Sequence, residues 1–199
     1  MTLLLVVVAY LLGATPTSYL VGRLCGVDLR REGSGNLGAT NAFRVLGWKP
    51  ALPILIVDVA KGWLPTYAFP LWAGRASPWW ALLFGAAAIV GHVYSVWVGF
   101  RGGKGVATSA GVLLALAPVA LLIGFLIWFG IVLSTGYVSL ASIIAAPAVA
   151  LAVAVLSGSG PVLWLTIAVA VFIIWAHRSN IRRLAASQEN RFGRRAGKG

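Results

Sequence analysis

The sequence predicts an all-α polytopic membrane protein, and three observations support this fold class. Of the 199 residues, 60% are hydrophobic and only 10% are charged, whereas about 25% of the residues in a soluble domain are charged. The mean hydropathy is +0.92. Several apolar stretches also reach the ~20 residues that a helix needs to cross a bilayer. We therefore expect a single integral membrane domain over residues 1–199, with no separate soluble domain.

The charge balance and the cysteine count exclude several classes of function. The net charge is +12, from 16 Lys and Arg against four acidic residues. In a chain this hydrophobic, such an excess favours anionic lipid headgroups and anionic substrates over nucleic acid, so we expect no nucleic-acid partner. Cys25 is the single cysteine and there are only two histidines, which excludes an internal disulfide and leaves no metal-ligand set. We expect neither a metal nor another cofactor.

The number of membrane helices depends on the stretch 106–134, which is too long for one crossing and short for two. Pro118 lies inside it, where a helix bends or breaks. Apart from Lys61 and Arg75, the basic residues form three clusters, which lie after the first span, after the third span and in the C-terminal tail. They are Arg23, Arg30, Arg31, Arg44 and Lys49; Arg101 and Lys104; and Arg178, Arg182, Arg183, Arg191, Arg194, Arg195 and Lys198.

Two crossings within 106–134 place all three clusters in the cytoplasm, as the positive-inside rule favours. We therefore predict seven transmembrane helices, several of them short, with the N-terminus out and the C-terminus in. Their expected ranges are 2–22, 50–72, 79–99, 106–117, 118–134, 137–157 and 161–177, followed by a cytoplasmic tail at 178–199. This topology places the glycine- and serine-rich segments on one face of the membrane.

The first polar motif, GSGNLGATN, occupies residues 33–41. Its glycines let the backbone turn and present N–H groups. Ser34 and Asn36 supply hydrogen-bonding side chains, and Arg44 can hold a phosphate by a two-pronged contact. The alternative is a flexible loop between helices, which needs neither this density of small polar residues nor the arginine. We therefore predict an anion-binding loop.

The second motif is Gly102, Gly103, Lys104 and Gly105, which leads directly into a helix. Backbone N–H groups, the helix dipole and the ammonium group together make an anion site. The motif is not a Walker A loop, because Val98 stands where that loop has its first glycine, and Gly105 follows the lysine in place of Ser or Thr. The alternative is that the basic residues only set the topology, which explains the charges but not the glycines.

Two further pairs of polar residues lie at predicted helix ends. Ser139 and Ser142 are three apart and share a face of the helix that begins near Tyr137, although membrane serines often only pack or bond a carbonyl. His177 and Asn180 share a face at the inner end of the last helix, where they can bind a polyol or take a proton.

The second span contains Asp58 and Lys61. Ionisable residues inside a membrane span are candidates for function. Their spacing also permits a pair that neutralises itself, so the sequence leaves both a catalytic and a structural role open. His92, in the third span, is more often a structural histidine than a base.

Five motifs, at residues 34–41, 58–62, 91–108, 137–142 and 177–184, resemble those of the bacterial acyl-phosphate-dependent glycerol-3-phosphate acyltransferases. The resemblance extends from about residue 10 to residue 193. It implies transfer of a fatty acyl group from acyl phosphate to the 1-hydroxyl of sn-glycerol 3-phosphate, giving lysophosphatidic acid and inorganic phosphate for phospholipid biosynthesis. It also implies a bacterial cytoplasmic (inner) membrane protein with its active site at the cytoplasmic face, without a cofactor or an obligate protein partner.

The resemblance also assigns roles to residues of this chain. Phosphate groups would be held by Ser34, Arg44 and Lys104, the glycerol hydroxyls by His177 and Asn180, and Ser142 would line the donor site. We expect catalytic roles for Ser34, Lys104 and His177. We expect substrate-binding roles for Asn36, Arg44, Gly102, Gly103, Gly105, Ser142 and Asn180.

The chain departs from the family pattern at three places. Ser95 stands where a proline is common, Gly136 where a basic residue commonly precedes Tyr137, and Ser187-Gln188 where Gly-Thr commonly precedes the glutamate at 189. Two other functions fit the composition: a small organic-anion membrane transporter, and a non-catalytic assembly factor. The position of the polar motifs at one membrane edge disfavours the transporter, and convergent phosphate-binding groups disfavour the assembly factor.

Overall fold

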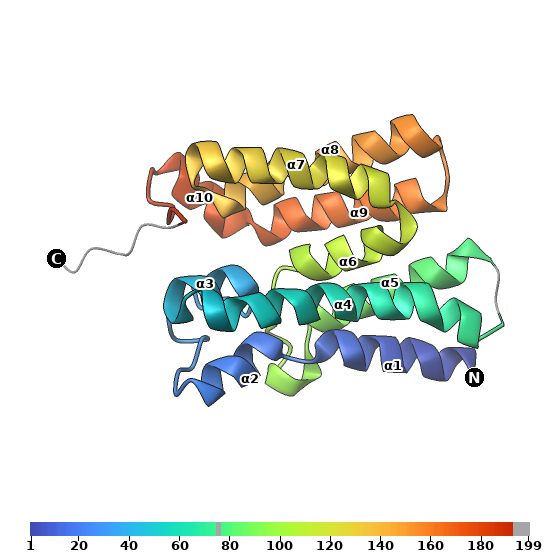
Figure 1. Ribbon diagram of the computed structural model, residues 1–199, viewed down its shortest axis with the longest axis horizontal. Helices are drawn as coiled ribbons and strands as arrows, with labels where there is room; N and C mark the ends of the chain where they lie inside the picture. Colours follow the sequence, from blue (N-terminus) through green and yellow to red (C-terminus); the bar gives the residue numbers. More distant parts are fainter. Residues whose placement is uncertain (75–76, 193–199) are drawn as a thin grey trace. The chain divides into compact units, whose positions relative to one another are not determined.

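The computed structural model describes residues 1–74 and 77–192, and every regular element within these ranges is helical (Figure 1). The elements are α1 (Thr2–Ala14), α2 (Thr17–Leu24), α3 (Ala39–Leu46), α4 (Trp48–Trp72), α5 (Pro78–Val93), a 3-10 turn η1 (Val96–Val98), α6 (Val106–Leu116), α7 (Pro118–Thr135), α8 (Val138–Ser157), α9 (Pro161–Ala176) and α10 (Arg178–Ala185). Three basic residues of the predicted C-terminal cluster, Arg194, Arg195 and Lys198, lie outside the described residues, as does Arg75.

Four helical segments are long and apolar enough to cross a membrane, namely Thr2–Leu24, Pro78–Val98, Pro118–Thr135 and Val138–Ser157. A fifth follows if α9 and α10, which are bent by 54° relative to each other, count as one span. The all-helical, multi-pass membrane fold is therefore observed within the described residues. The count of seven crossings and the orientation of the termini stay predictions.

Two breaks between successive helices coincide with prolines. The sequence placed a break near Pro118, and α6 ends at Leu116 while α7 begins at Pro118. A second break, which the sequence analysis did not predict, separates α1 from α2 at Pro16. Proline has no N–H to donate to the preceding turn, so each break lies where a helical hydrogen bond cannot form.

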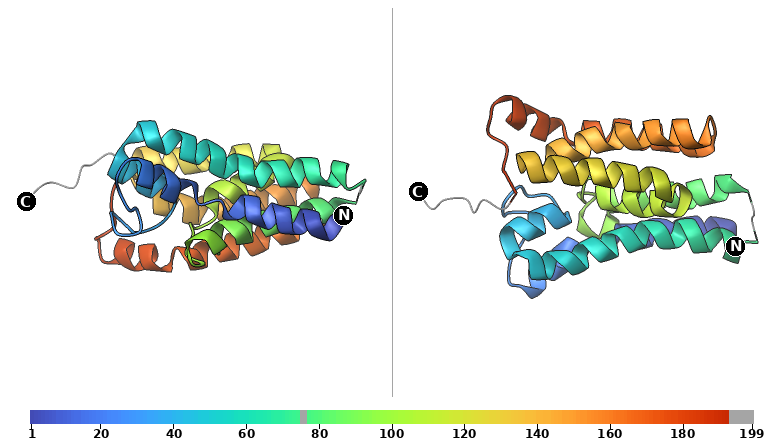
Figure 2. Two further views of the ribbon diagram at one scale, coloured as in Figure 1. Left: turned by 90° about the horizontal axis from the view of Figure 1, so that it is seen from below. Right: turned by 45° about the horizontal axis from the view of Figure 1, so that its top comes forward.

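The chain forms two compact units, residues 1–116 and 117–199, which we describe separately. In the first unit, α1 packs along α5, and α4 packs along both α5 and α6 (Figure 2). Small residues allow this close approach: a Cβ at Gly111 of α6 would overlap the Val59 carbonyl of α4. The core of this unit near α3 is apolar. It consists of Leu29, Leu37, Ala42, Ala51, Ile54 and Val98.

In the second unit, α8 lies between α7 and α9 and packs against both. Gly124 of α7 faces Val149 of α8 with no room for a side chain. The rest of α7 is largely exposed and apolar, as expected of a helix that faces lipid. Its exposed large side chains are Val119, Leu122, Ile123, Phe125, Leu126, Phe129 and Leu133.

The close contact of Gly111 with α4 leads to a prediction about stability. We expect Gly111→Ala to lower the free energy of unfolding by about 1–3 kcal/mol, because the added Cβ must displace helix backbone rather than a flexible side chain. Gly130 of α7 is the matched control, because a Cβ there meets nothing within 4 Å. Thermal unfolding in lipid nanodiscs measures both variants. Equal melting temperatures for the two would contradict the close packing of α4 on α6.

Candidate active site

The loop before α3 is built around the side chain of Asn41, which is 1% exposed. Its Oδ1 accepts a hydrogen bond from the Ser34 N–H (2.8 Å), and its Nδ2 donates to the carbonyls of Leu29 (3.2 Å) and Glu32 (3.1 Å). Gly33 has φ +62°, and a Cβ there would overlap the Asn41 amide oxygen. The glycine and the asparagine therefore fix the backbone of the first polar motif.

The candidate binding residues of this motif lie outside that buried scaffold. Ser34 is exposed, and Asn36 and Arg44 are half-buried. Arg44 is on α3, one turn after Asn41. The first motif thus separates into an asparagine that holds the loop and polar side chains that remain at its surface.

The second motif uses its glycines differently from the sequence prediction. The N–H of Gly102 donates to the Val93 carbonyl (2.9 Å) and that of Gly103 donates to the His92 carbonyl (3.2 Å). These two amides hold the loop to the end of α5 and do not point to a free anion site. Gly105 has φ +80° and directly precedes α6. The first N–H groups of a helix have no intrahelical partner, so the amides after Gly105 are the better candidates for anion binding.

The structure brings the two motifs together within the first unit. A Cβ at Gly103 would lie 3.0 Å from the Leu37 carbonyl, so the two loops are in contact there. Leu37 and Val98, one from each segment, are buried in the same apolar cluster. Lys104, which is half-buried, follows the contact directly. The predicted phosphate-binding residues of this unit therefore lie on two loops that pack against each other.

In the second unit, the Glu189 carboxylate connects three elements. Its Oε1 accepts hydrogen bonds from Asn180 Nδ2 of α10 (2.7 Å) and Ser139 Oγ of α8 (3.0 Å), and its Oε2 accepts from Arg183 Nε (2.7 Å). Burial alone would raise the pKa of Glu189, but these three donors outweigh it and hold that pKa below its ordinary value. Sequence reasoning did not identify this hub, because Ser139 and Glu189 are 50 residues apart.

His177 lies at the junction of α9 and α10, and Asn180 lies in the first turn of α10. Both are buried. Nδ1 of His177 is 2.8 Å from the Ile173 carbonyl. A carbonyl only accepts, so Nδ1 carries the proton, and in the neutral ring Nε2 holds the lone pair. Nε2 is therefore the ring nitrogen that could accept a proton.

Ser142 has a packing role in this structure. Its hydroxyl donates to the Val138 carbonyl (2.9 Å) and accepts from Trp128 Nε1 (3.2 Å), which joins α7 to α8. A phosphate or an acyl carbonyl can only accept, and the single hydroxyl proton is already used. Of the two readings that the sequence left open for this serine, the packing role fits these contacts better.

The structure explains two of the three departures from the family pattern, and nothing in it explains Ser187-Gln188. Ser95 is buried and its hydroxyl donates to the Ala14 carbonyl at the end of α1. Gly136 ends α7 with φ +75°, a conformation that favours glycine, and a cation still lies beside Tyr137, because the Arg191 guanidinium stacks 5.1 Å from that ring. Ser187 has φ +56° after α10.

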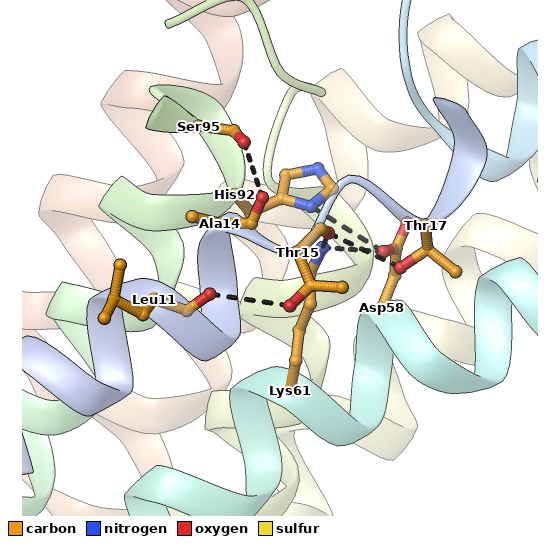
Figure 3. A network of polar contacts seen from close by, with 8 residues as sticks. All are labelled: Leu11, Ala14, Thr15, Thr17, Asp58, Lys61, His92 and Ser95. Atoms are coloured by element: carbon orange, nitrogen blue, oxygen red, sulfur yellow. Dashed lines mark hydrogen bonds and ion pairs between the residues drawn. The ribbon is translucent and has the colours of Figure 1, made fainter. Parts of the chain in front are cut away.

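The buried ionisable residues of the membrane helices form a network (Figure 3). Lys61 Nζ lies 2.8 Å from Asp58 Oδ1, so the predicted self-neutralising pair is present. His92 Nδ1 faces the same oxygen at 3.8 Å. Among the described residues, no group of three or more His, Cys, Asp or Glu side chains is placed to hold a metal ion.

Comparison with known proteins identifies the family. A model of the family described as glycerol-3-phosphate acyltransferase matches residues 3–187. The chain belongs to this family. It is 46% identical to the glycerol-3-phosphate acyltransferase of Geobacter sulfurreducens over 190 residues, covering 96% of this chain and 97% of the relative. It is 45% identical to that of Halalkalibacterium halodurans over 197 residues, covering 96% of each chain.

Solved structures of the family have the same fold. The crystal structure of PlsY, an integral membrane glycerol 3-phosphate acyltransferase, in its glycerol 3-phosphate form has a TM-score of 0.90 and 44% identity, with 96% of each chain covered. The lysophosphatidic acid form of PlsY has a TM-score of 0.88 and 43% identity, covering 96% of this chain and 95% of PlsY. The resemblance noted from the five motifs is therefore confirmed at the level of the family and the fold.

The Glu189 hub predicts a pH-dependent loss of stability. We expect Glu189→Gln to lower the free energy of unfolding at about pH 7 by about 2 kcal/mol, because an amide nitrogen replaces one acceptor of a charged hydrogen-bond network. Since the folded-state pKa of Glu189 lies below its ordinary value, the carboxylate contributes fully above the ordinary value. Its contribution disappears as the pH falls through the folded-state pKa.

The difference in the free energy of unfolding between wild type and Glu189→Gln should therefore be smaller at about pH 3 than at about pH 7. Thermal unfolding at both pH values measures it. Arg182→Gln is the control, because Arg182 belongs to the same short helix but makes no contact with the Glu189 carboxylate in the described network. A difference in the free energy of unfolding that does not change with pH would contradict a charged Glu189.

Proposed function

We propose that this protein is a glycerol-3-phosphate acyltransferase that uses acyl phosphate as the donor. It moves the fatty acyl group to the 1-hydroxyl of sn-glycerol 3-phosphate and produces lysophosphatidic acid and inorganic phosphate. Membership of the family supports the reaction, and its relative PlsY is described in glycerol 3-phosphate and lysophosphatidic acid forms. The structural observation that carries the proposal is the contact between two glycine-rich loops, one bearing Ser34 and Asn36 and the other Lys104.

Both substrates are anions, and the first unit supplies cations and helix ends for them. Lys104 precedes the first turn of α6, where the amide groups and the helix dipole favour a phosphate. Arg44 offers a planar, two-pronged guanidinium. We assign phosphate binding to these two residues, with Ser34 and Asn36 as additional hydrogen-bonding groups. Gly102, Gly103 and Gly105 set the path of the loop, so that the backbone can approach the phosphate closely.

In the second unit we assign the glycerol hydroxyls to His177 and Asn180. Asn180 donates through Nδ2 to Glu189. This hydrogen bond fixes the orientation of the Asn180 side-chain amide, including its oxygen. His177 donates through Nδ1 to the Ile173 carbonyl, which fixes the imidazole. Both side chains are therefore oriented by their neighbours before any substrate binds.

The reaction needs no nucleophilic side chain. Acyl phosphate is already activated, so the glycerol hydroxyl oxygen attacks the acyl carbon directly. A new ester bond forms, the bond between the acyl carbon and the phosphate oxygen breaks, and phosphate leaves with the electron pair. The hydroxyl proton passes either to Nε2 of His177 or to a substrate phosphate oxygen. Positioning and charge stabilisation then supply most of the rate.

We place the protein in the bacterial cytoplasmic membrane, with seven crossings, the N-terminus outside and the reaction at the cytoplasmic face. The distribution of basic residues supports this orientation. The acyl chain of the donor can remain in the bilayer while the phosphate groups meet the polar loops. No cofactor or obligate protein partner is part of the proposal.

Acyl transfer by the purified protein in lipid tests the proposed function. Palmitoyl phosphate and radiolabelled glycerol 3-phosphate are supplied, with acyl-CoA and acyl-carrier-protein donors in parallel. We expect lysophosphatidic acid from acyl phosphate alone, with stoichiometric release of phosphate. Folded protein that yields no product with any donor would overturn the proposal. Uptake of label into sealed vesicles without product would instead favour an anion transporter.

Lys104 is predicted to be essential for phosphate binding. Lys104→Ala should reduce kcat/KM by at least about 100-fold. The reason is that the Lys104 ammonium group would no longer make a charge-assisted contact to phosphate in the transition state. Arg101→Ala is the matched control, because Arg101 is an exposed cation of the same loop, and it should retain activity near that of wild type. Lysophosphatidic acid formation over a range of both substrates measures the effect. An active Lys104→Ala protein would contradict the proposed phosphate site.

The proton acceptor is decided by His177→Ala. If Nε2 of His177 takes the proton, turnover at saturating substrate should fall about 100- to 10,000-fold, the range of general-base catalysis. His177→Gln, which can still donate a hydrogen bond, separates binding from proton transfer. Near-normal kcat in His177→Ala would exclude the histidine as base and assign that role to a substrate phosphate.

A further inference from the structure

A buried charged cluster in the first unit is not used by the proposed reaction. Asp58 and Lys61 of α4 are 1% and 7% exposed, and His92 of α5 is 6% exposed. Lys61 Nζ lies 2.8 Å from Asp58 Oδ1 and donates to the Thr15 carbonyl at 3.0 Å. Figure 3 shows the three side chains converging beneath the break between α1 and α2.

The cluster joins three helical segments at one level. Asp58 and Lys61 come from the middle of α4, His92 from the last turn of α5, and Thr15 from the junction of α1 and α2. His92 Nδ1 is 3.8 Å from Asp58 Oδ1. This distance is too long for a hydrogen bond, but the carboxylate favours a proton on Nδ1, and Nε2 then faces the opposite direction.

On that opposite side, His92 contacts the glycine loop. A Cβ at Gly103 would overlap Nε2 of His92, so the ring lies directly against the loop backbone. The His92 carbonyl accepts from the Gly103 N–H (3.2 Å), and the Val93 carbonyl accepts from the Gly102 N–H (2.9 Å). The loop before Lys104 is therefore held to the end of α5 by the carbonyls of His92 and Val93, and Gly103 also contacts the His92 ring.

We propose that Asp58, Lys61 and His92 are positioning residues for the glycine loop, and that they set the place of Lys104 without touching substrate. This inference rests on the proposed function of Lys104. The ion pair fixes the imidazole between α4 and the loop, and the imidazole contacts the loop backbone at Gly103. Small substrate-positioning errors have large effects on rate.

The energetics of a buried ion pair favour this role over simple stabilisation. Burying two charges costs about as much as their attraction returns, so a pair of well-packed neutral side chains is often equally stable or more stable. Ionisable residues inside membrane helices are costly and rare, and they usually mark a function. The position of the imidazole, by contrast, depends on the pair, because Asp58 Oδ1 lies 3.8 Å from His92 Nδ1 and is itself paired with Lys61.

Hydrogen–deuterium exchange of the full chain in lipid nanodiscs tests the inference independently of catalysis. The first variant is His92→Ala, which removes the imidazole that contacts the loop at Gly103. The second is the charge-neutral double variant Asp58→Asn/Lys61→Met, which leaves no unpaired buried charge. The control is Thr66→Val. Thr66 is buried on the same helix and its hydroxyl only donates to the Gly62 carbonyl (2.7 Å) in the described contacts.

We expect the amides of residues 100–105 to exchange at least about tenfold faster in His92→Ala and in the double variant, but not in Thr66→Val. The KM of the phosphate substrate that the loop holds should rise about tenfold in the same two variants, with a smaller change in kcat. A purely structural cluster would instead change thermal stability and exchange throughout the first unit.

Unchanged exchange of residues 100–105 in folded His92→Ala and in the double variant would overturn the inference. Equal acceleration in Thr66→Val would also overturn it, because the effect would then be general to α4. Failure of the proposed function is a different result, since wild-type protein would give no lysophosphatidic acid while the difference in loop exchange could still be measured.

Discussion

Pro16 cannot donate an amide hydrogen, and the arrangement of the first unit depends on this constraint. The first helix ends just before Pro16, which leaves carbonyls of its last turn without i to i+4 partners. The Ala14 carbonyl accepts from Ser95, and the Thr15 carbonyl accepts from Lys61 at 3.0 Å. Each donor comes from a different helical segment. The break in one helix thus specifies the level at which two others must pack.

Satisfying that carbonyl with a lysine introduces a charge, and the charge needs its own partner. Asp58 supplies it from the preceding turn of α4 at 2.8 Å. The carboxylate in turn faces His92, whose ring and carbonyl hold the glycine loop. These contacts therefore connect the helix break at Pro16 to the backbone that precedes Lys104. In the second unit, one carboxylate connects helices in a similar way, because Glu189 accepts hydrogen bonds from donors on α8 and α10.

Much of the fold could be predicted from the sequence, because apolar length and proline position depend on neighbouring residues only. The break at Pro118 and the pairing of Asp58 with Lys61 follow from such local rules. The Glu189 hub could not be predicted, since it joins residues 50 apart. The hydrogen bonds of the Gly102 and Gly103 amides could not be predicted either, because the carbonyls that accept from them belong to the preceding helix; the anion-binding role of this loop stays a prediction.

Buried polar residues of this protein hold the backbone of its loops and helix ends in place. Asn41 and Glu189 are buried and bonded to several partners each, and both hold a loop or a helix end in place. Ser34 is exposed and Lys104 is half-buried on loops that such residues support. A reaction that relies on an activated donor gains its rate from fixed geometry rather than from a reactive side chain. Loops of glycine and serine have no rigidity of their own. The buried polar groups therefore supply, through tertiary hydrogen bonds, the order that the glycine-rich sequence of the loops lacks.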